Sequence, residues 1–168
     1  QLSFFHGYYD QHMYHPLLIF DGERGHLVSA VLRPGNAHAA RGAMGVLRRI
    51  IRRLKQRFPQ VQIVVRGDSA FAVPRVLRML EELDRELGGV VYLFGLAQNA
   101  VLLRYGATAL TEARVRFRAL KQTVQHFDAF AYAAESWPHA RHVVMKAEVS
   151  AEGANPRFVV TSLPEFAP

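Results

Sequence analysis

Cysteine is absent from the sequence, which excludes a disulfide framework and any metal site built from thiolates. Long apolar runs are absent too: none approaches the ~20 residues of a membrane-spanning helix, and the N-terminus lacks the charged-then-apolar pattern of a signal peptide. Both absences favour a cytoplasmic protein without a membrane partner. What is present is a globular composition, with 50% hydrophobic and 21% charged residues in a chain of 168, enough for one hydrophobic core.

Acidic residues are missing from one stretch, and this determines where the net charge of +7 lies. Seven of the 21 basic residues fall between residues 41 and 57, which contain no Asp or Glu; the remaining 14 basic residues equal the 14 acidic ones in number. The seven are Arg41, Arg48, Arg49, Arg52, Arg53, Lys55 and Arg57. A localised basic stripe is typical of a phosphate-binding protein, and a solvated helix face is the alternative.

The first elements follow from apolar patterning. Residues 15–20 and 26–33 predict two strands joined by the Gly-containing loop 21–25, and their nearly continuous apolar runs predict burial on both faces. Residues 37–58 predict a helix, because apolar residues recur at steps of three and four. These apolar residues are Met44, Leu47, Ile51, Leu54 and Phe58.

A βαβ unit follows. A strand at 61–66, a helix at 73–87 and a strand at 90–96 predict parallel pairing of the two strands. The pattern downstream is less regular: it predicts a helix at 111–123 and strands at 127–133, 141–149 and 157–162.

This element order predicts the fold class. A hairpin that leads into a βαβ unit describes an α/β fold with a ribonuclease-H-like mixed sheet and flanking helices, followed by a β-rich insertion; one further leading strand would complete the core. We expect residues 1–105 to form the central part of the core and residues 106–168 a helix plus the insertion segment. The chain opens with Gln1 and ends at 161–168 without a closing element, so we expect an internal fragment.

Asp68 is the strongest single candidate for chemistry. It lies just past the end of the predicted strand 61–66, at the sheet edge where ligands of α/β proteins bind, and the adjacent Gly67 allows close approach. A carboxylate there is a natural ligand for a hard divalent ion. The alternative is that Asp68 caps the helix that begins near Val73. The acidic residues of that helix, Glu81, Glu82, Asp84 and Glu86, are expected to be solvated.

Other residues suggest nucleic-acid contacts. The loop Arg33-Pro-Gly-Asn36 precedes the basic helix and could reach phosphates or base edges, although ordinary turn chemistry also explains it. Trp137 could stack on a base or belong to the core. The histidines His6, His12, His15, His26 and His38 match no zinc spacing cleanly.

Seven strings, taken in order along nearly the whole chain, resemble the DDE transposases of bacterial insertion sequences, in the subgroup whose ribonuclease-H-like fold carries a β-rich insertion. They are Phe5-His-Gly-Tyr-Tyr-Asp10, His15-Pro-Leu-Leu18, Leu32-Arg-Pro-Gly-Asn-Ala-His38, Arg66-Gly-Asp-Ser-Ala-Phe71, Phe94-Gly-Leu-Ala-Gln-Asn99, Ser136-Trp137 and Arg157-Phe-Val-Val-Thr161.

The resemblance implies a catalytic role for Asp68. Three carboxylates bind the metals in this family; the second follows a central strand in an Arg-Gly/Ala-Asp context, which Asp68 matches, and no match to the first or third is found in this sequence. Mg²⁺ or Mn²⁺ would then support DNA cleavage and strand transfer in the intact protein, and the chain alone is expected to be inactive.

The resemblance also implies partners. They are DNA, as transposon ends and target, and a second copy in a synaptic complex, in the bacterial cytoplasm at the nucleoid. The residues expected to contact DNA are Arg33, Asn36, Arg41, Arg48, Arg52, Lys55, Arg66 and Trp137. Two alternatives stay open: a non-catalytic DNA-binding remnant of a transposase, and a ribonuclease-H-like nuclease unrelated to transposition.

Overall fold

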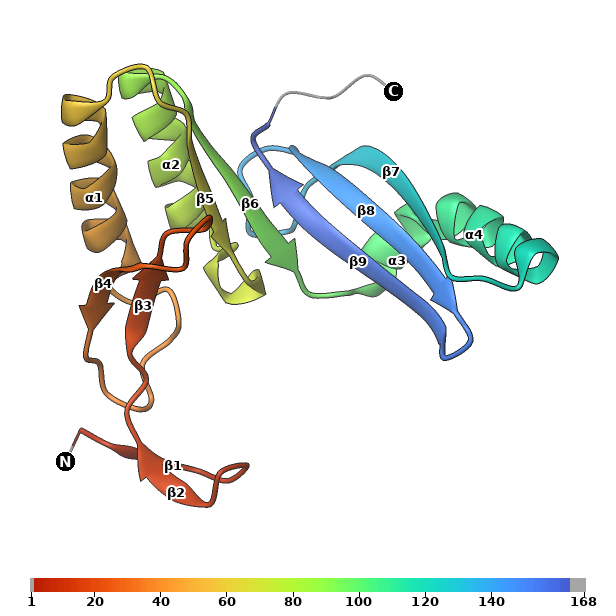
Figure 1. The fold of residues 1–168 in the computed structure, drawn as a ribbon, viewed down its shortest axis with the longest axis horizontal. Helices are drawn as coiled ribbons and strands as arrows, with labels where there is room; N and C mark the ends of the chain where they lie inside the picture. The colour runs from red at the N-terminus through yellow and green to blue at the C-terminus, as the bar shows by residue number, and fades with distance from the viewer. Residues whose placement is uncertain (1, 164–168) are drawn as a thin grey trace. The chain divides into compact units, whose positions relative to one another are not determined.

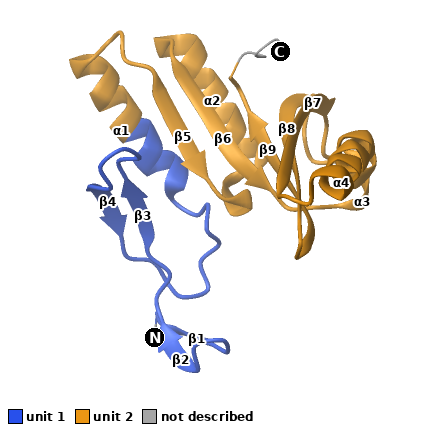
Figure 2. Ribbon diagram, turned by 45° about the vertical axis from the view of Figure 1, so that its right-hand side comes forward, with its two compact units in different colours: residues 1–49 blue, residues 50–168 orange. Residues whose placement is uncertain are grey.

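The computed structural model describes residues 2–163, which fall into two compact units, residues 2–49 and 50–163 (Figure 2). The first unit contains two antiparallel hairpins. The second contains a five-stranded mixed sheet with flanking helices. The boundary expected between residues 105 and 106 stays a prediction, although strand pairing crosses it, as shown below.

The first unit is built from β1 (Phe4–His6) with β2 (Gln11–Met13), and β3 (Leu17–Phe20) with β4 (Leu27–Val31). The hairpin predicted from residues 15–33 is confirmed, and the short β1–β2 hairpin was not predicted. The expected burial of β3 and β4 on both faces is wrong. Five of their eight apolar side chains are exposed, namely Leu18, Phe20, Leu27, Val28 and Ala30, because each ribbon in this unit has only two strands.

Arg33 holds the end of the β3–β4 hairpin. Its guanidinium is buried and donates to the backbone oxygens of His15 at 2.8 Å, Ala39 at 2.6 Å and Arg41 at 2.9 Å. Burial, together with the nearby charge of Arg41, lowers the pKa of Arg33. Gly35 follows in the same turn, where a Cβ would collide with the backbone oxygen of Met13. The Arg-Pro-Gly motif therefore fixes a backbone turn.

The helix α1 (Ala43–Arg57) begins six residues after the predicted start, since the preceding residues form turns. Its apolar face is narrower than predicted. Ile51 is buried, but Phe58, just past the helix end, is 53% exposed. Lys55 is buried instead, because its ammonium donates to the backbone oxygen of Val61 at 2.6 Å and so closes the turn that leads out of the helix.

The sheet of the second unit has the order β5-β6-β9-β8-β7. The predicted βαβ unit is confirmed: β5 (Ile63–Gly67) and β6 (Val90–Leu96) are parallel and are joined through α2 (Pro74–Leu87). The other strands are antiparallel to their neighbours, namely β7 (Val124–Tyr132), β8 (Arg141–Ser150) and β9 (Gly153–Thr161). Because β9 pairs with β6, the expected insertion continues the sheet of the expected core.

Helices cover one face of this sheet (Figure 1). The helix α2 packs on β6, and α4 (Ala107–Leu120) packs on β7 and β8. The short helix α3 (Ala100–Tyr105), which was not predicted, is capped by the Asn99 side chain. The core between helices and sheet contains the stacked rings of Tyr92 and Phe94. The result is a mixed α/β fold.

Candidate functional site

Asp68 lies immediately past β5 and is exposed. Its Oδ1 accepts a hydrogen bond from the backbone N–H of Ala70 at 2.9 Å and caps the short 3-10 helix η1 (Ser69–Phe71). The expected alternative role as a cap of α2 is wrong, since α2 begins with Pro74 after Val73. Within residues 2–163, Oδ2 of Asp68 accepts no hydrogen bond. One carboxylate oxygen therefore stabilises the turn while the other faces solvent.

Two glycines hold the Asp68 loop against the sheet. A Cβ on Gly67 would lie 3.1 Å from the rings of Phe71 and Phe94. A Cβ on Gly95, in β6, would lie 3.4 Å from the backbone nitrogen of Ser69 and 3.8 Å from the Cα of Asp68. The loop thus packs directly over Gly95, which fixes Asp68 at the end of the two parallel strands.

Among residues 2–163, no cluster of carboxylates or imidazoles surrounds Asp68. Across the part of the chain that the structure describes, no group of three or more His, Cys, Asp or Glu side chains could hold a metal ion. Asp21 accepts hydrogen bonds from the backbone N–H groups of Glu23 and Arg24, so its carboxylate stabilises the hairpin turn between β3 and β4.

The acidic residues of α2 were expected to be solvated, and for Glu81 and Asp84 this is wrong, whereas Glu82 and Glu86 are exposed. Glu81 forms a bidentate pair with Arg141, at 2.7 and 3.1 Å, and accepts a hydrogen bond from the Tyr92 hydroxyl at 2.9 Å. Asp84 accepts from the backbone N–H of Val90, and Glu86 pairs with Arg52 at 2.6 Å. Only Glu82 is both exposed and without a hydrogen bond among the described residues.

The Glu81–Arg141 pair is shielded from solvent, with 21% of the Glu81 side chain and 3% of the Arg141 side chain exposed. Burial raises the pKa of Glu81, but the hydrogen bonds from Arg141 and Tyr92 and the charge of Arg141 outweigh it, so the pKa lies below its ordinary value. Burial lowers the pKa of Arg141, and the bonds to Glu81 more than compensate. Sequence patterning missed this pair because its members are 60 positions apart.

Trp137 belongs to the same buried cluster. It is buried, its ring lies 5.1 Å from the guanidinium carbon of Arg141, and the ring of Tyr132 meets it edge-on at 5.6 Å. One guanidinium nitrogen of Arg141, Nη1, is buried without a hydrogen-bond partner among residues 2–163. Trp137 therefore packs in the core of the second unit, which is the alternative that the sequence left open.

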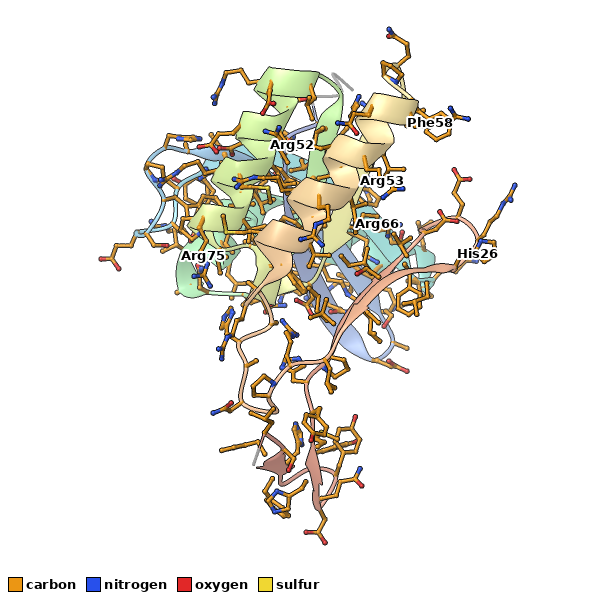
Figure 3. The ribbon with its side chains drawn as sticks, turned by 90° about the vertical axis from the view of Figure 1, so that its left-hand side faces the viewer. His26, Arg52, Arg53, Phe58, Arg66 and Arg75 are labelled. Carbon is orange, nitrogen blue, oxygen red and sulfur yellow. The ribbon has the colours of Figure 1, made fainter. Side chains whose placement is uncertain are left out.

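The residues expected to contact DNA fall into two groups. Arg33, Lys55 and Trp137 are buried, and the first two bind backbone oxygens. The exposed members are Asn36, Arg41, Arg48, Arg52 and Arg66. Figure 3 shows Arg52 on the side of α1 that faces α2, where it pairs with Glu86, and Arg53 on the opposite side. None of the helices formed by residues 2–163 is long and apolar enough for a membrane crossing.

The second unit combines a mixed α/β sheet, an exposed carboxylate just past a parallel strand, and arginines on the neighbouring helices. These features define an α/β protein with an exposed carboxylate at the sheet edge where proteins of this class bind ligands. The family model described as Transposase DDE domain group 1 matches residues 1–168, and the chain therefore belongs to the DDE transposases. Comparisons with curated proteins and with solved structures gave no match.

Family membership implies transposase function and a ribonuclease-H-like fold. DDE transposases typically cleave DNA and transfer its strands, generally with a divalent metal, so membership also implies DNA binding.

Proposed function

We propose that this chain is part of a transposase catalytic domain that cleaves DNA and transfers strands, and that Asp68 is one of its metal-binding carboxylates. The observation that carries the proposal is the position of Asp68. It is exposed just past the end of β5, beside the parallel strand β6, and a glycine in β6 leaves room for its loop. That edge is where α/β sheets bind ligands.

The donor chemistry of Asp68 fits Mg²⁺ or Mn²⁺ in part. A carboxylate oxygen is the hard ligand that these ions prefer, and Oδ2 is available while Oδ1 caps η1. A bound ion would supply charge stabilisation and an activated nucleophile at the phosphodiester. A single carboxylate is too few for such a site, so we propose that other segments of the protein supply the remaining carboxylates.

We also propose that residues 1–105 belong to the catalytic core and residues 106–168 to a helix and the β-rich insertion. The support is that α4, β7 and β8 pack on one another, whereas β5, α2 and β6 form the βαβ unit that holds Asp68. The pairing of β9 with β6 would then anchor the insertion on the core. A homodimer in a synaptic complex stays a prediction.

Metal dependence tests the proposal. The protein that contains this chain should cleave transposon-end DNA in Mg²⁺ or Mn²⁺ and lose cleavage when the ions are removed with EDTA, while DNA binding persists, because the ions act on the reacting phosphodiester. Gel analysis of labelled ends measures cleavage, and a mobility-shift assay measures binding. DNA binding without cleavage in either ion would instead identify a non-catalytic remnant. The family match supports a transposase over an unrelated nuclease.

The exposed arginines of α1 are proposed to bind the DNA backbone. Arg48 and Arg53 are exposed and have no carboxylate partner within residues 2–163, whereas Arg52 forms an exposed ion pair with Glu86 at 2.6 Å. We expect Arg53→Ala to reduce the slope of log affinity against log salt concentration by about 1, and Arg48→Ala with Arg53→Ala by about 2, since each neutralised phosphate contributes about 0.9.

The matched control is Arg52→Ala, one position away on the same helix. Because Glu86 already pairs with Arg52, its loss should change the slope by less than the loss of Arg53. The slopes come from fluorescence anisotropy titrations of labelled duplex DNA at several salt concentrations. An unchanged slope in the double variant would show that α1 is a solvated surface.

A further inference from the structure

The sheet of the second unit has an open face at β7, β8 and β9. Along β8, buried side chains such as Val143 and Met145 alternate with partly exposed ones such as Lys146 and Glu148. The buried set faces α3 and α4, since a Cβ on Gly106, between these helices, would collide with the Met145 side chain. Figure 1 shows α3 and α4 behind the three strands and none of the described helices in front of them.

An aromatic ring and two cations share one row on this open face. Phe127 of β7 is the direct cross-strand partner of Lys146, which is in turn the partner of Arg157 in β9. Direct partners in an antiparallel sheet place their side chains on the same face, about 5 Å apart. Phe127 is 62% exposed although it is a large apolar side chain. These three residues are called the stacking platform below.

The next row of cross-strand partners on this face consists of Gln125, Glu148 and Asn155, and it holds Lys146 in place. The Glu148 carboxylate accepts hydrogen bonds from Lys146 at 2.8 Å, from Gln125 at 2.7 Å and from Asn155 at 3.5 Å. The bond from Lys146, and then that from Gln125, lowers the pKa of Glu148, and Arg157 contributes through its charge. The carboxylate thus stays ionised and orients Lys146. Because Lys146 and Arg157 carry two positive charges and Glu148 one negative charge, the two rows together have a net charge of about +1.

The platform lies on the same sheet face as Asp68 and at the same end of the sheet. Gly95, which lies under the Asp68 loop, pairs with Val159, and Arg157 is two residues further toward the C-terminal ends of β5 and β6. Phe127 is four strands from β5. At about 4.8 Å per strand, this places the Phe127 ring about 20 Å from Asp68. Along a strand that keeps the duplex rise of about 3.4 Å per nucleotide, this distance corresponds to about six nucleotides.

We propose that the stacking platform binds an unpaired DNA base about six nucleotides from the phosphodiester at Asp68. This inference rests on the proposed function, which supplies DNA as the ligand. An exposed ring offers a surface on which any base can stack, and flanking cations neutralise the phosphates of the same strand. Phe127 thereby has the accessibility for base stacking that the buried Trp137 does not.

The affinity of the protein for a ten-residue oligothymidylate, measured by fluorescence anisotropy, tests the platform. Phe127→Ala should weaken this affinity about 5- to 100-fold, because the loss of one aromatic–base stack has this effect. Phe127→Trp should retain it, since the ring is kept. The matched control is Leu120→Ala, because Leu120 is also 62% exposed but lies on α4, across the sheet.

A crosslinking arm locates the base. Transposon-end DNA with 5-iodo-deoxyuridine at an unpaired position about six nucleotides from the cleavage site should crosslink, on irradiation, to the peptide that contains Phe127. Crosslinks to other peptides would overturn the inference, as would a Phe127→Ala variant that binds oligothymidylate as tightly as wild type or that changes only the self-association of the protein.

The two proposals can fail separately. If the protein cleaves DNA in a metal-dependent way but Phe127→Ala leaves oligothymidylate affinity unchanged, only the stacking platform is wrong. If the platform binds the base but the protein does not cleave DNA, only the proposed function is wrong.

Discussion

Replacement of Asp68 by Asn is expected to lower DNA cleavage by the intact transposase by more than about 100-fold, since loss of even an outer partner of a metal ligand costs 10- to 100-fold. The neutral amide oxygen of Asn is a poorer ligand for Mg²⁺ than a carboxylate. The fold should be kept, because Asn caps helices as well as Asp does and can accept the same hydrogen bond from the Ala70 N–H. Single-turnover cleavage of labelled transposon ends measures the effect.

The control for this variant is Glu82→Gln. It removes the same charge from an exposed position on α2, so cleavage should stay within about twofold of wild type. Duplex DNA affinity should be unchanged in both variants, which separates binding from chemistry. If Asp68→Asn cleaved within about threefold of wild type, Asp68 would be only the cap of η1 and its proposed metal role would be wrong.

Removal of Glu81 is expected to have the largest effect on stability in the second unit. Glu81→Ala leaves the Arg141 guanidinium buried without its carboxylate, and an uncompensated buried charge of this kind lowers the free energy of unfolding by about 3 kcal/mol. Urea unfolding measured by tryptophan fluorescence reports the change directly. Trp137 is the only tryptophan in this sequence and lies against Arg141.

The stability difference between wild type and Glu81→Ala should depend on pH. The folded-state pKa of Glu81 is below its ordinary value, so the ion pair contributes fully at neutral pH, above the unfolded-state pKa of about 4.3. Its contribution should be lost as the pH falls through the lower, folded-state pKa. Unfolding curves of the two proteins should therefore converge in acid. A difference that persists unchanged there would contradict the ionised pair.

A double-mutant cycle separates the pair from its parts. Glu81→Met combined with Arg141→Met should be less destabilised than the sum of the single variants by more than about 1 kcal/mol, because the double variant leaves no buried charge unpaired. Glu82→Gln, the adjacent exposed position, should change stability by less than about 0.5 kcal/mol. Additive single effects would mean that the two side chains are not coupled.

Local patterns in the sequence determined most of the elements. The periodicity of residues 73–87 and the β-branched runs on either side predict α2, β5 and β6 nearly to their observed ends, because such short elements are specified by neighbouring residues. The position of Asp68 past β5 follows from the same local pattern. Its family context came from resemblance, and the match to the DDE family confirms the family.

Tertiary structure alone decided which charged and aromatic side chains are buried. Arg33, Lys55 and Trp137 have the residue types of a DNA-binding surface, yet the first two satisfy backbone oxygens and the third packs against Arg141. A side chain's type does not encode whether carbonyl groups converge on it, because these carbonyls belong to other turns and strands.

The same reason explains the open sheet face. Phe127, Lys146 and Arg157 lie far apart in sequence, and only the register of three antiparallel strands aligns them. The sequence by itself determined that α1, α2 and α4 form, together with the βαβ unit and the location of Asp68 at a strand end, whereas α3 was not predicted. Long-range strand pairing and packing decided which sheet face is open and which cations lack a carboxylate partner. Each of these contacts joins segments that no local sequence pattern relates.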